Sequence, residues 1–162
     1  MKRKLSTAAI SVVVAFSLLF TACGDPGREF VKDTDRVAGY VGTGLTMINR
    51  LEGDGSISTA AALKATQALN QVNIANRELI QVAKSYKVTD ASGNTTIVLP
   101  EEGSARMLAI LDTSTATINT LISNPDFLSI NPNTRKQIVD LLNSLNATLK
   151  SLVDLVAAAK KK

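Results

Sequence analysis

Histidine and tryptophan are absent from the 162-residue sequence, and cysteine occurs only once. A single cysteine cannot form a disulfide within the chain. Without histidine there is no zinc site of the Cys/His type and no Ser/His or Cys/His nucleophile pair. Aromatic residues make up 4% of the chain, which leaves few side chains on which sugars or bases can stack. These absences argue against most enzyme classes, and we expect neither a catalytic site nor a cofactor.

Positive charge is concentrated near the two ends of the sequence. Lys2, Arg3 and Lys4 precede a long apolar run, and residues 160 to 162 are all lysine. The formal net charge is +4, but without residues 1 to 22 the chain keeps 15 basic and 14 acidic residues, a net charge of +1. A nucleic-acid-binding surface needs basic side chains gathered on one face. We therefore expect no nucleic-acid partner.

The first 22 residues have the anatomy of a secretory signal peptide: a basic start, an apolar run over residues 5 to 20, and small residues before Cys23. With its box Phe20-Thr21-Ala22-Cys23, this leader resembles a bacterial lipoprotein signal peptide. The last three residues of the box match the family, which usually has leucine at the position of Phe20. The resemblance covers residues 1 to 23 only, and the family of the remaining chain is not recognised.

The resemblance implies that Cys23 is the lipidation site. In that family the cysteine sulfur carries diacylglycerol through a thioether, the leader is cut just before it, and the new amino group often receives a fatty acyl chain such as palmitate. Each buried CH₂ contributes about 0.8 kcal/mol, so two or three chains hold a protein on a membrane permanently. Relatives with aspartate after the cysteine commonly stay at the inner membrane. Gly24 therefore favours the outer membrane, facing the periplasm, in a Gram-negative cell.

Two alternatives for the leader remain open, namely an uncleaved transmembrane helix and an ordinary signal peptide with an incidental cysteine. Residues 5 to 22 form a run of 18 residues that includes five serines and threonines, which is marginal for a membrane span.

Four amphipathic segments follow a short tether over residues 24 to 27, each with apolar or small residues at three- and four-residue spacing. The first, from Arg28, carries Phe30, Thr34, Val37, Val41, Ile48 and Leu51, widened by Ala38 and Leu45. The second, residues 59 to 86, carries Ala61, Ala65, Ala68, Val72, Ala75, Leu79, Val82 and Tyr86. The third, from Pro100, carries Leu108, Leu111, Thr115, Ile118 and Ile122. The fourth, from Pro132, carries Ile138, Leu142, Leu145, Leu149, Leu152, Val156 and Ala159.

This pattern predicts an all-α fold, an antiparallel four-helix bundle over residues 28 to 162, preceded by a cleaved signal peptide (1 to 22) and the lipidated cysteine with its tether (23 to 27). Residues 87 to 99 break the helical period and predict a small β-hairpin or an extended loop between the second and third helices. We expect Phe127, Leu128 and Ile130 to close one end of the bundle. The alternative architecture is a pair of helical hairpins that completes its core by dimerising.

Three glycines, Gly39, Gly42 and Gly44, interrupt the first helix. Their spacing is not that of a phosphate-binding loop, and a close helix crossing or a bend is the favoured interpretation. Residues 52 to 58 superficially resemble a calcium loop, but Arg50 and Ala61 occupy its two strongest ligand positions. A turn followed by an N-cap at Ser56 or Ser58 is favoured there instead, and we expect no metal site.

Four further features of the sequence are compatible with a functional surface. The amides Gln67, Asn70, Asn73 and Gln81 can bind a glycan or a partner, or simply face solvent. Glu101 and Glu102 fit the dipole at a helix start better than acid/base catalysis. Residues 87 to 99 are the favoured recognition loop. The lysines at 160 to 162 suit a helix C-terminus, although Lys162 also resembles the last lysine of the murein lipoprotein, which is joined to peptidoglycan.

The sequence therefore favours a membrane-anchored lipoprotein that acts as a non-catalytic structural or protein-interaction module of the cell envelope. Its partner is expected to be another protein or a second copy of the chain. The alternative is a lipoprotein that binds a small ligand or glycan in the bundle core or at residues 87 to 99. An enzyme is the least favoured class, and toxin, immunity or phage-exclusion roles are left open.

Overall fold

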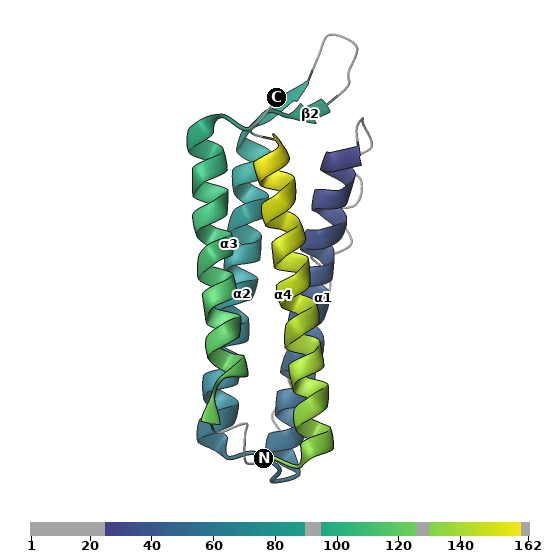
Figure 1. The fold of residues 1–162 in the computed structure, drawn as a ribbon, viewed down its shortest axis with the longest axis vertical. Coiled ribbons are helices and arrows are strands. Elements are labelled where there is room, and N and C mark those ends of the chain that lie inside the picture. The colour runs from purple at the N-terminus through teal and green to yellow at the C-terminus, as the bar shows by residue number, and fades with distance from the viewer. Residues whose placement is uncertain (1–24, 90–94, 126–129, 160–162) are drawn as a thin grey trace, which may run out of the picture.

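The computed structural model describes residues 25–89, 95–125 and 130–159. Within them lie the helices α1 (Asp25–Gly53), α2 (Thr59–Ser85), α3 (Glu101–Ile122) and α4 (Pro132–Ala159), and the strands β1 (Lys87–Thr89) and β2 (Thr95–Ile97). Each helix packs against the next, and α1 also packs against α4, which closes the ring (Figure 1). The predicted all-α four-helix bundle is confirmed. The alternative, in which two helical hairpins complete their core by dimerising, is not what is observed.

The apolar faces of α1 and α4 are buried as their spacing predicts. In α1 all six residues of the predicted stripe are buried, and so is Asp33 beside them. In α4 burial follows the predicted positions from Ile138 to Val156, while Ala159 is only half-buried. Residues three and four apart share one side of a helix, so each helix turns a continuous apolar surface to the core.

The buried faces of α2 and α3 differ from the prediction. In α2, Leu69 and Asn76 are buried, whereas Ala68 and Ala75 are half-buried. A straight helix has 3.6 residues per turn, so its inner face drifts by about 20° per heptad from a strict seven-residue repeat. The observed burial follows that drift. In α3, burial at Gly103, Ser104, Met107, Ser114 and Leu121 accompanies the predicted Leu111 and Ile118.

In α3 the predicted buried face was displaced by one residue at three positions. Leu108, Thr115 and Ile122 are half-buried, one residue beyond the buried Met107, Ser114 and Leu121. Leu108, Thr115 and Ile122 lie on one flank of the buried face rather than at its centre. Periodicity identifies the buried side of a helix, but not which flank the neighbouring helices cover.

Helix boundaries follow the proline positions closely. α1 begins at Asp25, three residues before Arg28, so Pro26 and Gly27, which we expected in a tether, lie in its first turn. Proline is tolerated there because the first N–H groups of a helix have no partner within it. Pro100 is the N-cap of α3 rather than its first residue, and Pro132 begins α4 as predicted. The first turn of α3 contains Glu101 and Glu102.

A tight turn joins α1 to α2. Gly55 has a φ of +74°, a conformation that glycine adopts without strain. Asp54 accepts a hydrogen bond of 2.9 Å from the Ser56 backbone N–H, and Ser58 Oγ accepts one of 3.1 Å from the Ala61 N–H. The predicted N-cap is therefore Ser58. Within the described ranges, no group of three His, Cys, Asp or Glu side chains is placed to hold a metal ion.

Of the three glycines in the middle of α1, Gly39, Gly42 and Gly44, only Gly44 lies at a close helix crossing. A Cβ at this buried position would lie 2.9 Å from Leu69 Cδ1 of α2 and 3.4 Å from Leu141 Cδ2 of α4. Gly39 and Gly42 have open space around the same point. The crossing that the sequence predicted is thus made by Gly44 alone.

The two strands pair antiparallel, with Lys87 opposite Ile97 and Val88 opposite Thr96. This confirms the predicted β-hairpin. The hairpin, the beginning of α1 and the end of α4 lie at one end of the bundle, which we call the hairpin end (Figure 1). At the opposite end, Ile130 is buried as expected. Phe127 and Leu128 lie outside the described residues, as do Cys23 and Lys162.

Candidate functional site

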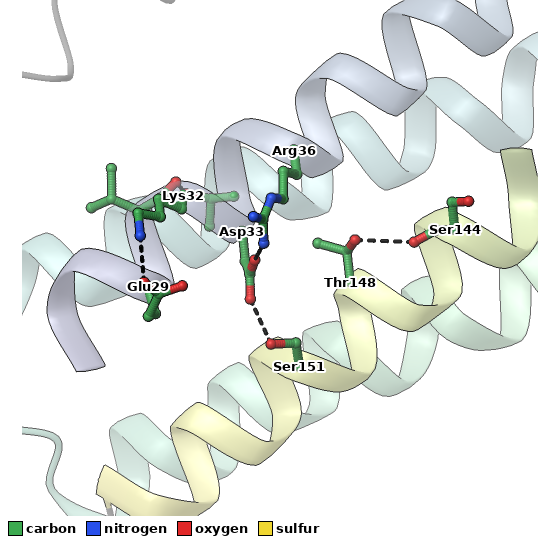
Figure 2. Close-up of polar contacts among 9 residues, drawn as sticks. Glu29, Lys32, Asp33, Arg36, Ser144, Thr148 and Ser151 are labelled. Atoms are coloured by element: carbon green, nitrogen blue, oxygen red, sulfur yellow. Dashed lines mark hydrogen bonds and ion pairs between the residues drawn. The ribbon is translucent and has the colours of Figure 1, made fainter. Parts of the chain in front are cut away.

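A buried carboxylate joins α1 to α4 near the hairpin end. Asp33 is only 2% exposed. Its Oδ1 lies 2.7 Å from Arg36 Nη1, and its Oδ2 accepts a hydrogen bond of 2.6 Å from Ser151 Oγ (Figure 2). The Arg36 side chain is 58% exposed, so the guanidinium neutralises the carboxylate from the bundle surface. Both carboxylate oxygens have partners, as a buried charge requires.

This cluster of non-covalent contacts joins two helices. Ser151 of α4 donates its hydroxyl proton to the buried carboxylate of Asp33 on α1, and Arg36 balances the charge of that carboxylate. The nearby Thr148 donates a hydrogen bond of 3.0 Å to the Ser144 carbonyl of its own helix (Figure 2). On this geometry Asp33 and Ser151 fix how α1 and α4 pack.

A second buried polar contact joins α1 to α2. Asn76 is 3% exposed, and its Nδ2 donates a hydrogen bond of 2.9 Å to the Thr34 carbonyl oxygen. Its Oδ1 has no partner among the described residues, and neither has the fully buried hydroxyl of Ser104 in α3. An unpaired buried polar atom costs about 1–3 kcal/mol. Asn76 therefore carries both a helix-joining bond and an unpaired oxygen.

A shallow groove of about 400 Å³ runs along the outside of α3 and α4. It is lined by Asp112, Thr115, Asn146, Ala147, Lys150, Val153 and Asp154. Asn146 Nδ2 donates a hydrogen bond of 2.7 Å to Asn119 Oδ1 across the two helices, while Asn146 Oδ1 has no partner in the described structure. This groove presents charges of both signs to a small polar molecule, whereas Asn146 Oδ1 is itself buried.

Ion pairs on the bundle surface lie both within and between helices. Lys136 and Asp140 form an i, i+4 pair at 2.5 Å within α4. Arg106 Nη2 of α3 donates a hydrogen bond of 2.8 Å to Glu78 Oε1 of α2, and this bond to the carboxylate raises the pKa of Arg106. Such exposed pairs contribute little to stability.

The amides of α2 and the two glutamates at the start of α3 lie mostly on the bundle surface. Gln67, Asn70 and Gln81 are exposed on α2, and Asn73 is half-buried. The exposed aliphatic side chains Leu63 and Ile74 lie on the same helix. Glu101 and Glu102 are exposed in the first turn of α3, where acidic side chains complement the helix dipole.

Cys23 lies two residues before Asp25, where α1 begins. A residue spans at most about 3.6 Å of extended chain, so the Cα atoms of Cys23 and Asp25 are no more than about 7 Å apart. Since α1 begins at the hairpin end, the chain connects Cys23 to the bundle at that end. None of the described helices has the length and hydropathy needed to cross a membrane.

Asp33, Ser151 and Asn76 were not singled out from sequence. A signal for Asp33 exists, because it lies three residues after Phe30 and four before Val37, both of which belong to the buried stripe. A charged residue at such a position must find a partner when the helix packs. The identity of that partner, on α4, is not readable from the spacing.

The comparisons with known proteins found no family model, no curated protein and no solved structure that matches this chain.

Proposed function

We propose that the protein is a bacterial membrane-anchored lipoprotein, acylated at Cys23, whose helical bundle is a non-catalytic structural or protein-interaction module of the cell envelope. The observation that carries the proposal is the box Phe20-Thr21-Ala22-Cys23 at the end of a signal-like leader. Cleavage before Cys23 would leave the lipidated cysteine two residues from the start of α1. The sole cysteine then has a defined role.

The polar side chains of the core support a structural role. Ser151 bonds α4 to Asp33 of α1, and Asn76 bonds α2 to the Thr34 carbonyl of α1. These polar groups therefore form hydrogen bonds between packed helices. A sequence without histidine also lacks the commonest general base.

The partner we propose is another envelope protein or a second copy of the chain. The outward surface of α2, with the amides Gln67 and Asn70 between Leu63 and Ile74, mixes apolar contact area with hydrogen-bonding groups, as protein interfaces do. Because glycine rather than aspartate follows Cys23, we favour an anchor in the outer membrane, facing the periplasm, in a Gram-negative cell. Crosslinking in intact cells from positions on this α2 surface identifies the partner.

Lipidation is tested with Cys23→Ser and, as a matched control in the leader but outside the box, Ser6→Ala. We expect the parent and the control to float with membranes and to yield an N-terminal peptide bearing the mass of a diacylglyceryl cysteine. The Cys23→Ser chain should lack that mass and lose membrane partitioning. Cys23→Ser protein that stays on membranes with residues 1 to 22 still attached contradicts the proposal and indicates an uncleaved helix.

A second candidate function is the binding of a small polar ligand or glycan in the α3–α4 groove. The observation that favours it is the lining of the groove, which includes the charged side chains of Asp112, Lys150 and Asp154. A bound cell-wall saccharide should raise the melting temperature of the parent and not of Asn146→Ala. Asn143→Ala, an exposed asparagine on α4 that does not line the groove, is the matched control. Equal shifts in all three chains exclude this site.

A further inference from the structure

The hairpin presents an apolar surface that the helices do not cover. Ile97 of β2 is half-buried and packs against the hydrophobic core. Successive residues of a strand point to opposite faces, and Lys87 is paired with Ile97, so the neighbours Val88 and Val98 share the other face. Their side chains are 51% and 58% exposed.

Contacts through Tyr86 connect the valine face of the hairpin to the bundle. The Val98 N–H donates a hydrogen bond of 3.1 Å to the Tyr86 carbonyl, which extends the pairing beyond β2 towards α2. The Tyr86 ring lies so close to Gly103 in α3 that any Cβ there would overlap it. These two contacts and the packing of Ile97 on the core place the outward valine face at the hairpin end.

The lipid anchor, if it is carried by Cys23, reaches the bundle at this same end. At most about 7 Å of chain separates the Cα atoms of Cys23 and Asp25. Acyl chains buried in a bilayer would therefore hold the start of α1, and the hairpin end with it, next to the lipid headgroups. A long flexible tether would leave the orientation free, but two residues restrict it strongly.

From these observations we infer that the hairpin end faces the membrane, with Val88 and Val98 in contact with the interfacial region of the bilayer. The inference rests on the proposed acylation of Cys23. Among the described residues of the hairpin and the first turn of α3, Lys87 is outnumbered by Glu101 and Glu102, so this part of the surface offers anionic headgroups no net positive charge. The apolar valines and the short connection to the anchor determine the orientation.

The test uses the full acylated chain in vesicles of phosphatidylcholine and phosphatidylglycerol. Acylation blocks the Cys23 sulfur, so a cysteine introduced elsewhere is the one thiol that a polarity-sensitive fluorophore can label. Val98→Cys reports on the hairpin face, and Val88→Cys is a second position on it. Leu63→Cys is the matched control: Leu63 is 57% exposed, against 58% for Val98, and about 33 Å of helix separates it from the end of α2.

We expect blue-shifted emission at positions 98 and 88, and quenching by lipids spin-labelled near the headgroup that is several-fold stronger than at position 63. Weak quenching at all three positions overturns the inference, and so does equal strong quenching, which means that the bundle lies on its side. Emission that is blue-shifted in cells but unquenched in vesicles means that a protein covers the valines, and also overturns it. A chain that neither floats nor carries the acyl mass overturns both proposals, whereas an acylated, floating chain with an unquenched hairpin overturns this one alone.

Discussion

Ser151 donates a hydrogen bond of 2.6 Å to the buried carboxylate of Asp33, a residue 118 positions earlier in the chain. The bond joins the last helix to the first at the closure of the four-helix ring. A hydrogen bond to a charged acceptor contributes about 1.5–3 kcal/mol, more than a bond between neutral groups. The Asp33–Ser151 pair is therefore the polar contact expected to matter most for the packing of α1 on α4.

Ser151→Ala should lower the free energy of unfolding by about 1–3 kcal/mol, because it leaves one oxygen of a buried carboxylate unpaired. Urea denaturation monitored by circular dichroism measures the change. Ser144→Ala is a suitable control, since the Ser144 hydroxyl bonds only to the Asp140 carbonyl of its own helix. A loss no larger in Ser151→Ala than in Ser144→Ala would show that the contact does not stabilise the fold.

Asn76→Leu should leave stability unchanged or raise the free energy of unfolding by about 1 kcal/mol. The substitution removes an unpaired buried oxygen, whose cost of about 1–3 kcal/mol offsets the bond to the Thr34 carbonyl. Asn76→Asp keeps the shape but buries a charge, and it should lower the melting temperature strongly. Thermal melts of both variants test the account, which is wrong if Asn76→Leu loses several kcal/mol.

Gly42→Ala and Gly44→Ala should have opposite effects although they lie two residues apart in one helix. Alanine in a helix interior is favoured over glycine by about 1 kcal/mol, and position 42 has room for the methyl group. At position 44 the methyl group would press on Leu69, whose own side chain is buried and cannot move freely. Gly42→Ala should thus melt higher than the parent and Gly44→Ala lower. Equal gains would mean that the crossing is looser than described.

The pKa of the Asp35 carboxyl is raised above its ordinary value because partial burial removes water from the charged form. An acid with a raised folded-state pKa destabilises the fold when ionised, and this cost disappears as pH falls below the unfolded-state pKa. Asp35→Asn should therefore raise stability at pH 7 by a few tenths of a kcal/mol, since the side chain is largely exposed. The gain should vanish near pH 3. A gain of the same size at both pH values would rule out ionisation as its cause.

Local features of the fold could be predicted from the sequence where one residue type has one dominant use. Pro132 starts a helix, Ser58 is one of the two expected caps, and Lys87–Thr89 pairs with Thr95–Ile97 in the segment expected to form a hairpin or an extended loop, because each choice is decided by its immediate neighbours. The stripe from Phe30 to Leu51 was equally readable, since all six of its positions are buried.

Features that depend on a second helix could not be predicted in this way. α3 carries apolar residues on two flanks, and the choice of Met107 over Leu108 is made by the helices that pack on it. Asp33 and Ser151 meet only because α4 returns beside α1. The candidate lipidation site at Cys23 follows a different logic, because it is recognised from a linear motif and needs no fold.

The order of the helices around the ring has a kinetic consequence. The α1–α2, α2–α3 and α3–α4 interfaces join neighbours in sequence, whereas α1 and α4 meet only through the whole intervening chain. Contacts between sequence neighbours form early, and those that close long loops form late. We expect α4 to dock on α1 last, and amide protons along that interface to exchange with solvent before those of the other three. Until docking occurs, Asp33 remains hydrated, so the carboxylate at the ring closure loses its water only when the last helix arrives.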